Sequence, residues 1–206
     1  MDTKEPSLCV LYASQILKET IGGIPTVIIE EKMQGEEFTF QALVGSGEIL
    51  PLPLVKDFKR LEEGDKGPNT GSMGSFSNGD GLLSFLKSSE KEQALNIMKR
   101  TIDFVDEYYA GESYCGFLYG QFMITKDGLR LVEYNVRPGD PEILNVMKIF
   151  NGELLPLFKA MLSGGLEETA RTVDFSVQPT VCKFIVPEGY PFEPIDPFDM
   201  KVDEIE

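Results

Sequence analysis

Two pairs of strands joined by tight turns constrain the fold of this 206-residue chain most strongly. Residues 36–45 (EEFTFQALVG) alternate apolar and polar side chains and lead through the turn GSG into a strand over 48–56. A second turn, KDG, joins strands over 115–125 and 129–137. Because tight turns join antiparallel neighbours, we expect a largely antiparallel sheet.

Helices are predicted around these strands. Apolar residues at helical spacing predict helices over 7–20, 89–110, 141–150 and 153–162. Ser89 and Glu92 form a capping box, and Asp140 followed by Pro141 predicts the start of another helix. Further strands are predicted over 25–33 and 179–186. The pattern indicates an α+β layer fold with packed helices.

The composition excludes several classes of function. Histidine is absent, so Ser–His–Asp and Cys–His catalysis and HExxH zinc sites are excluded. The net charge of −15 argues against a nucleic-acid surface. Cys9, Cys115 and Cys182 are far apart, which suits a reducing compartment. With no signal peptide and no apolar run near the ~18 residues of a membrane span, we expect a cytoplasmic protein without nucleic-acid or membrane partners.

The segment LVEYNVRPGDPE, over 131–142, is the most informative for chemistry. Alternate residues of a strand share a face, and the face expected in the core carries Val132, Tyr134 and Val136. The opposite face carries Glu133, Asn135 and Arg137.

This polar face suggests a metal and anion site. Glu133 and Asn135 present oxygen ligands of the kind that Mg²⁺ prefers, and they could converge on one or two ions. Arg137 could hold a phosphate or carboxylate, and Asp140 lies at a predicted helix start, where N–H groups favour an anion. The alternative is a solvated strand face that ends in a capped helix.

Two further segments combine charge with exposed backbone. The stretch KDFKRLEEGDKGPNTGSMG, over 56–74, lies in a predicted loop over 57–81, and its glycines let N–H groups approach a ligand closely. It lacks the closing G-K-[ST] of a P-loop, and the alternative is a flexible linker. In IEEKMQGEE, over 29–37, Glu30 could accept a hydrogen bond from a purine amine and Glu37 from ribose hydroxyls; the alternative is an acidic hairpin face. Gln121 could face Glu133 across the second hairpin.

In this order, IEEKMQGEE, DFKRLEEGDKGPNTGSMG and GFLYGQFMITKDGLRLVEYNVRPGDPE resemble the phosphoribosylamine–glycine ligase (glycinamide ribonucleotide synthetase) family of the ATP-grasp superfamily. The resemblance runs from about residue 25 to residue 190. It implies the C-terminal lobe of an ATP-grasp fold. It also implies ATP-dependent ligation of glycine to 5-phosphoribosylamine through a glycyl phosphate, with Mg²⁺ or Mn²⁺, giving glycinamide ribonucleotide, ADP and phosphate in purine biosynthesis.

The resemblance implies a role for individual residues. ATP would be bound by Glu30, by the backbone near Lys32 and Met33, and by Glu37. The metal would be bound by Glu133 and Asn135. Substrate would be bound by Asp57, Lys59, Arg60, Asn69, Thr70, Gly71 and Glu142. The catalytic region would contain Arg137 and Asp140.

The chain departs from the family at Phe58, Ser72 and Pro138, where histidine, glycine and an aromatic residue are common. The family's full chain is considerably longer. We therefore expect a remnant of the lid lobe over 1–24, the catalytic lobe over 25–165 and the start of a truncated C-terminal domain over 166–206. A complementary N-terminal half of a split enzyme would supply the missing lobe. Two alternatives remain: a degenerate nucleotide- or metal-binding module without turnover, and a truncated, functionless product.

Overall fold

A computed structural model describes residues 6–19, 25–109 and 112–192, and its contacts divide the chain into two units, Met1–Gln34 and Gly35–Glu206. The smaller unit contains α1 (Pro6–Glu19), which confirms the first predicted helix. Residue 20, the last of that predicted helix, lies outside the described residues. The lobes expected over 1–24, 25–165 and 166–206 stay a prediction.

The strand predicted over 25–33 is wrong, because residues 25–34 form neither helix nor strand. Two of its β-branched side chains are exposed, Ile28 at 80% and Ile29 at 89%. Strand propensity reflects how a side chain fits a half-buried pleated surface, and this run has no such surface within its own unit. The first strand instead begins at Gly35.

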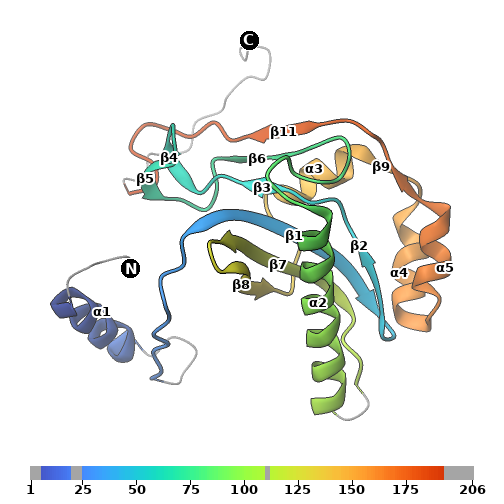
Figure 1. The fold of residues 1–206 in the computed structure, drawn as a ribbon, viewed down its shortest axis with the longest axis horizontal. Helices are drawn as coiled ribbons and strands as arrows, with labels where there is room; N and C mark the ends of the chain where they lie inside the picture. Colours follow the sequence, from blue (N-terminus) through green and yellow to red (C-terminus); the bar gives the residue numbers. More distant parts are fainter. Residues whose placement is uncertain (1–5, 20–24, 110–111, 193–206) are drawn as a thin grey trace. The chain divides into compact units, whose positions relative to one another are not determined.

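The larger unit is built on a four-stranded antiparallel sheet with the order β2-β1-β7-β8 (Figure 1). Its strands are β1 (Gly35–Gly45), β2 (Glu48–Pro51), β7 (Gly116–Thr125) and β8 (Gly128–Asn135). Both predicted hairpins are confirmed, and with them the α+β class. The strand β2 ends at Pro51 and not near residue 56, although Leu52 N–H still donates to the Gln41 carbonyl at 2.9 Å and Val55 forms an isolated bridge with Thr39.

The predicted loop over 57–81 contains short strands. These are β3 (Lys56–Asp57), β4 (Arg60–Glu62), β5 (Lys66–Asn69) and β6 (Gly74–Ser77). A second sheet has the order β11-β6-β3, where β11 (Thr180–Lys183) is the core of the strand predicted over 179–186. The two-stranded sheet of β4 and β5 lies beside it (Figure 1). These short strands were not predicted because their polar sequence carries no alternating apolar pattern.

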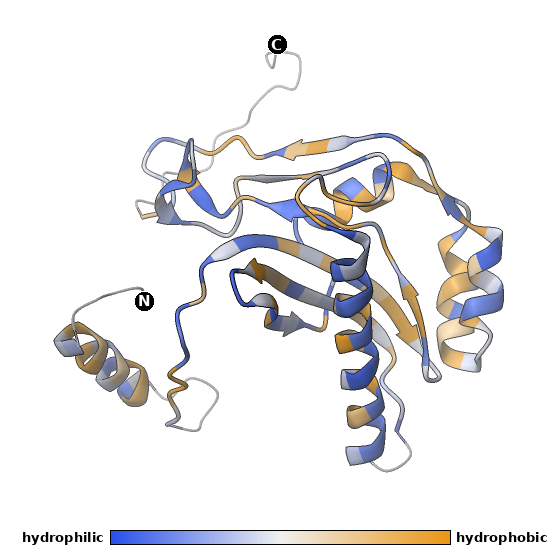
Figure 2. Ribbon diagram, in the orientation of Figure 1, coloured by the Kyte–Doolittle hydropathy of each residue, from blue (hydrophilic) through white to orange (hydrophobic). Residues whose placement is uncertain are grey.

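The helix α2 (Ser88–Tyr108) covers one face of the main sheet. It buries Ala94, Met98 and Ile102 in a cluster with residues of β1 and β7 that include Phe38 and Phe122, whose rings stack at 5.6 Å. Figure 2 shows hydrophilic and hydrophobic residues alternating along α2, as expected of a helix with one buried side.

The predicted capping box of α2 is wrong by two residues. The N-cap is Lys87, and its backbone N–H donates to Glu90 Oε2 at 2.7 Å. The chain therefore enters the helix two residues earlier than Ser89 suggests.

The remaining elements follow β8. They are α3 (Glu142–Ile149), β9 (Phe150–Asn151), α4 (Leu154–Ser163), α5 (Leu166–Thr169), a 3₁₀ turn (Ala170–Thr172) and β10 (Asp174–Phe175). The N-cap of α3 is Pro141, one residue later than predicted from Asp140. Pro156 lies in the first turn of α4, where an N–H has no intrahelical partner to lose. None of the described helices is long and apolar enough to cross a membrane.

The face of the main sheet opposite α2 changes character along β1. At its far end Leu43 packs against Leu157 and Met161 of α4. At its near end the same face is polar, as described below. The backbones of β1 and α4 come very close at Gly45, where an added Cβ would lie 2.6 Å from the carbonyl carbon of Met161.

We predict that G45A lowers the free energy of unfolding by about 3 kcal/mol, because backbone cannot move aside as a flexible side chain can. The matched control is G47A in the same hairpin, where an added Cβ meets nothing within 4 Å and the cost, about 1 kcal/mol, comes from its φ of +78°. Urea unfolding of both variants measures the difference. Equal destabilisation by both would contradict the close approach.

Candidate functional site

Three neighbouring strands turn a row of polar side chains toward the side opposite α2. Cross-strand partners project to the same face of a sheet. Thr39 pairs with Gln121, and Gln121 pairs in turn with Glu133. The next row joins Gln41, Tyr119 and Asn135. The sheet therefore has an apolar face for the core and a polar face for a site, and the predicted pairing of Gln121 with Glu133 is confirmed.

A bulge in β8 changes which residues reach the core. The partner of Gln121 is Glu133 but the partner of Phe122 is Leu131, so Val132 is the extra residue. Val132 lines a cleft instead of the core, and Val136 is 73% exposed. The predicted core positions at Val132 and Val136 are therefore wrong, whereas Tyr134 packs against the core as expected. A bulge breaks the period of two on which that prediction depended.

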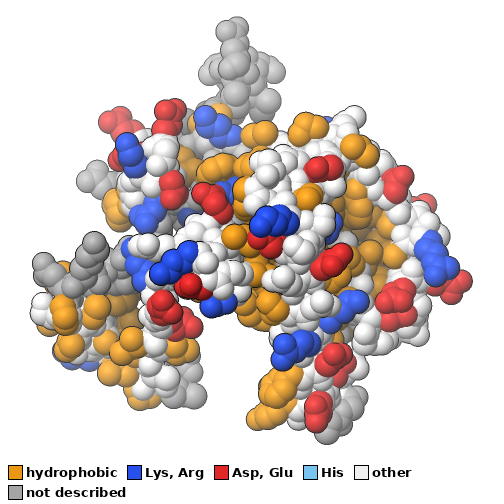
Figure 3. Space-filling view, in the orientation of Figure 1, with side chains coloured by type: hydrophobic (Ala, Val, Ile, Leu, Met, Phe, Trp, Pro, Cys, Tyr) orange, Lys and Arg blue, Asp and Glu red, His pale blue; other side chains and the backbone are white. Residues whose placement is uncertain are grey.

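Two clefts open over the polar face. The larger, of about 990 Å³, extends between the start of β1 and the strands β3 to β6 and β11. The smaller, of about 210 Å³, lies over the end of β8 and the start of α3. Both are lined by Asp57, Lys59, Gln121 and Glu133. Figure 3 shows Lys and Arg side chains beside Asp and Glu side chains on the part of the unit that carries β4 and β5.

The clefts bring together the predicted site residues of the larger unit. The larger cleft is also lined by Glu37, Arg60 and Asn69. The smaller is also lined by Thr70, Gly71, Asn135, Arg137, Asp140 and Glu142. The other three predicted residues, Glu30, Lys32 and Met33, belong to the smaller unit, and their role stays a prediction.

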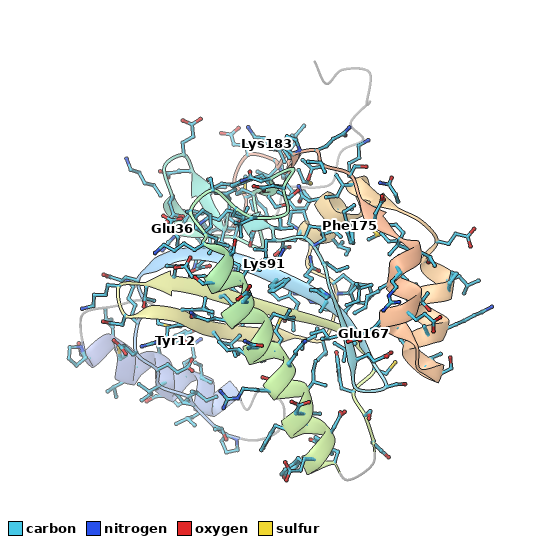
Figure 4. All side chains as sticks on the ribbon, turned by 45° about the vertical axis from the view of Figure 1, so that its right-hand side comes forward. Tyr12, Glu36, Lys91, Glu167, Phe175 and Lys183 are labelled. Carbon is cyan, nitrogen blue, oxygen red and sulfur yellow. The ribbon has the colours of Figure 1, made fainter. Side chains whose placement is uncertain are left out.

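A buried amide joins two charged residues of the larger cleft. Lys59 Nζ donates to Gln121 Oε1 at 2.6 Å, and Gln121 Nε2 donates to Glu37 Oε2. Gln121 is only 2% exposed. Close by, Lys56 forms a salt bridge of 2.9 Å with Glu36, which is labelled in Figure 4 near the beginning of β1.

Glu142 is buried beneath the smaller cleft. Its Oε1 accepts hydrogen bonds from Tyr119 Oη at 2.6 Å and from Thr39 Oγ1 at 3.2 Å. Burial and the negative charge of Glu142 raise the pKa of Tyr119. The phenol therefore stays protonated and is the donor in its hydrogen bond to Glu142. At Gly139 a Cβ would lie 2.7 Å from Glu142 Oε2, so the carboxylate requires a glycine there.

The roles of Tyr119 and Thr39 were not predicted from the sequence. The signal that could have revealed them is their position in the alternation. Both lie in register with residues of the polar face, where a buried phenol and a buried hydroxyl need partners.

Among the carboxylic acids that line the clefts, Asp57 has the pKa that is shifted most. Burial raises its pKa from the ordinary value of 3.8 to about 6, and the charge of Glu142 adds to the rise. Ser72 opposes it, because Ser72 Oγ donates to Asp57 Oδ1 at 2.5 Å and stabilises the charged form, as Lys59 does by its charge. Ser72 is therefore the direct partner of a predicted substrate residue.

The donor set at the end of β8 fits a hard cation held together with a phosphate. Asn135 Nδ2 donates to Glu133 Oε1 at 3.1 Å, so these two side chains are adjacent. The described residues contain no cluster of three or more His, Cys, Asp or Glu side chains placed to hold a metal. Mg²⁺ commonly takes one or two protein oxygens and completes its shell with phosphate oxygens and water. Arg137, whose Nη1 donates to the carbonyl of Pro138 at 2.9 Å, lies exposed beside them.

Known proteins resemble this chain over most of its length. Residues 3–143 match the family model described as phosphoribosylglycinamide synthetase, ATP-grasp (A) domain. Phosphoribosylamine–glycine ligase from Methanothermobacter thermautotrophicus is 44% identical over 193 residues, which cover 94% of this chain and 43% of that protein. The ligase from Pyrococcus furiosus is 43% identical over 178 residues, covering 86% and 39%. The chain thus spans less than half the length of these curated relatives.

Solved structures share the fold. The crystal structure of phosphoribosylamine–glycine ligase from Thermotoga maritima superposes with a TM-score of 0.65 at 28% identity, covering 87% of this chain and 44% of that one. The biotin carboxylase domain of a thermophilic 2-oxoglutarate carboxylase superposes with a TM-score of 0.52 at 12% identity, covering 86% and 37%. At that identity the likeness concerns the fold alone.

We predict that the contribution of Asp57 to the free energy of unfolding falls as the pH rises from about 4 to about 6, because the folded chain holds the proton of Asp57 more tightly than the unfolded chain does. The stabilisation is fully present below the ordinary pKa and is lost as the pH passes the raised one. The substitution D57N removes the contribution of Asp57 to this pH dependence. Urea unfolding of both proteins at a series of pH values measures the difference. The same pH dependence in D57N would contradict the assignment.

A second variant tests the cause. S72A removes the hydrogen bond that favours the charged form, so we expect the pKa of Asp57 to rise further. Carbon NMR titration of the Asp57 carboxyl group in S72A and in the unaltered chain measures this shift directly. An unchanged or lowered pKa would remove Ser72 from the account.

Proposed function

The chain belongs to the phosphoribosylglycinamide synthetase family, and we propose that it carries the metal and substrate side of a phosphoribosylamine–glycine ligase. In the proposed reaction glycine is joined to 5-phosphoribosylamine through a glycyl phosphate, and ATP is converted to ADP and phosphate. The supporting observation is that every predicted site residue of the larger unit lines one of two adjoining clefts.

The chemistry requires positioning and charge stabilisation. The glycine carboxylate attacks the terminal phosphorus of ATP, and the amine of phosphoribosylamine then displaces phosphate from the acyl phosphate. Neither step needs a protein nucleophile, which agrees with the absence of histidine-based dyads. Lys59 and Arg60 supply positive charge in the larger cleft, and Arg137 supplies it beside the smaller. We assign the catalytic roles to Arg137, for the charge on the phosphoryl group, and to Asp140, for orienting a substrate amine.

Other residues hold the reactants. Glu37 accepts hydrogen bonds from the ribose, and adenine is assigned to Glu30 and the backbone near Lys32 and Met33. Substrate contacts are assigned to Asp57, Asn69, Thr70 and Gly71. Because Glu142 is buried and held by Tyr119 and Thr39, we assign it a supporting place beneath the substrates. Mg²⁺ or Mn²⁺ would be held by Glu133 and Asn135 and would supply Lewis-acid neutralisation of the phosphate charge.

The remaining parts of the ligase would come from the complementary portion of the enzyme. We place the reaction in the cytoplasm, because the three cysteines are free thiols that suit a reducing compartment. The second candidate is a nucleotide- or metal-binding module without turnover. The observation that favours it is that Phe58, which lines the larger cleft between the predicted substrate residues Asp57 and Lys59, stands where the resemblance implies a histidine.

The test is ADP release with Mg²⁺, ATP, glycine and freshly formed phosphoribosylamine, each omitted in turn. We expect turnover that needs all three substrates when this chain is mixed with a separately made N-terminal portion of the ligase. Calorimetry with ATP and Mg²⁺ accompanies the assay. Nucleotide binding without turnover in the mixture would favour the binding module, and turnover without glycine would contradict the ligase.

We predict that E133Q lowers the Mg²⁺-dependent turnover of the mixture by about a hundred-fold or more, because it removes a charged metal ligand. The control is E36Q, which removes a carboxylate on the same sheet that pairs with Lys56. E36Q should keep turnover within a few-fold. Equal effects of the two variants would remove Glu133 from the metal role.

A further inference from the structure

Gln121 occupies an unusual place, because it lines both clefts and touches a charged residue on each side. It lies on β7 in the middle of the polar face, in register with Thr39 on one neighbour and Glu133 on the other. Its oxygen accepts from Lys59 and its nitrogen donates to Glu37. Lys59 follows β3 and Glu37 lies on β1, so the amide joins two separate elements.

The partners fix the orientation of this amide. A lysine can only donate a hydrogen bond and a carboxylate can only accept one, so the oxygen must face Lys59 and the nitrogen must face Glu37. A rotated amide would lose both bonds at once. Neither leucine nor glutamate could replace glutamine here, since leucine offers neither group and glutamate offers only the acceptor.

Because Gln121 is buried, its hydrogen bond to Lys59 depends on its hydrogen bond to Glu37. Gln121 is 2% exposed, so water cannot readily replace a lost partner. If a ligand took the Glu37 oxygen that Gln121 now holds, the amide would have to turn or stay unsatisfied on that side. Turning breaks the bond to Lys59, and an amide that no longer donates is also a weaker acceptor, because hydrogen bonds in a chain polarise one another. Movement at Glu37 is thereby transmitted to Lys59 without a direct contact between them.

We propose that Gln121 is a positioning residue that couples the nucleotide side of the site, at Glu37, to the substrate side, at Lys59. The functional meaning rests on the proposed function, which places ribose hydroxyls at Glu37. Ribose would compete with Gln121 for the carboxylate, and the amide would then release Lys59 toward the reacting groups. By linkage, a ligand that engages Lys59 favours nucleotide binding to the same degree.

The first test measures the Lys59 amine in the chain itself. The rate of acylation of each lysine by an N-hydroxysuccinimide ester is followed by peptide mass spectrometry. In Q121L we expect Lys59 to react about ten-fold faster, the factor that matches the loss of a hydrogen bond to a charged group. Lys56 lines the same cleft but is held by Glu36, so its rate serves as the internal control and stays unchanged.

The second test measures the coupling without any ligand. We expect E37L to raise the Lys59 rate through the amide, since both residues hydrogen-bond to Gln121. The same E37L change in the Q121L background should add nothing, which is the signature of a shared link. Q121E is the companion if Q121L fails to fold. It keeps the acceptor for Lys59 and loses the donor to Glu37, so its Lys59 rate should not respond to E37L.

The outcomes separate this proposal from the proposed function. An unchanged Lys59 rate in Q121L, or an equal effect of E37L in both backgrounds, would overturn the positioning role of Gln121.

Calorimetry with ADP then tests the nucleotide assignment separately. Binding that raises the Lys59 rate in the unaltered chain but not in Q121E supports the coupling. Binding that raises it equally in both would overturn the coupling. Absence of binding would count against the proposed function, and the ligand-free cycle would still decide the role of Gln121.

Discussion

The antiparallel ladder between β1 and β7 is the interaction on which the rest of the larger unit depends. It runs without interruption from Gly35 opposite Thr125 to Val44 opposite Gly116. One face stacks Phe38 on Phe122 beneath α2, and the other places Thr39 beside Gln121 in the site. A slip of one residue would exchange the two faces, so the hydrophobic core also fixes the register of the polar side chains.

Neutral side chains hold four of the charged residues that line the clefts. An amide holds Lys59 and Glu37, a serine hydroxyl holds Asp57, and a phenol holds Glu142. A neutral partner fixes a charged side chain in place without cancelling its charge. The charge then remains available to a phosphate, a carboxylate or an amine that enters the cleft, which suits a site whose work is electrostatic.

The sequence was informative where a period repeats and silent where one is interrupted. The alternation over 36–45 and the helical spacing over 89–110 predict β1 and α2 closely, and the site residues that the resemblance named in the larger unit all line the clefts. The short polar strands between residues 56 and 77 have no period to detect. The bulge at Val132 shifts the alternation of β8 by one residue. The run at Ile28 and Ile29 has high strand propensity but is exposed, with no sheet surface on which to pack. Tyr119 and Ser72 were missed because their roles arise from pairing across the fold.

The position of Cys182 gives the molecule its own reporter group. This thiol lines the larger cleft on β11 and is half-buried, whereas Cys9 and Cys115 are exposed. Replacing the two exposed cysteines with serine would leave a single attachment point for an environment-sensitive dye on the wall of that cleft. Burial raises the pKa of Cys182, and the charge of Asp140 adds to this, so attachment proceeds best in mildly alkaline buffer. Changes in the cleft could then be followed as changes of fluorescence in real time.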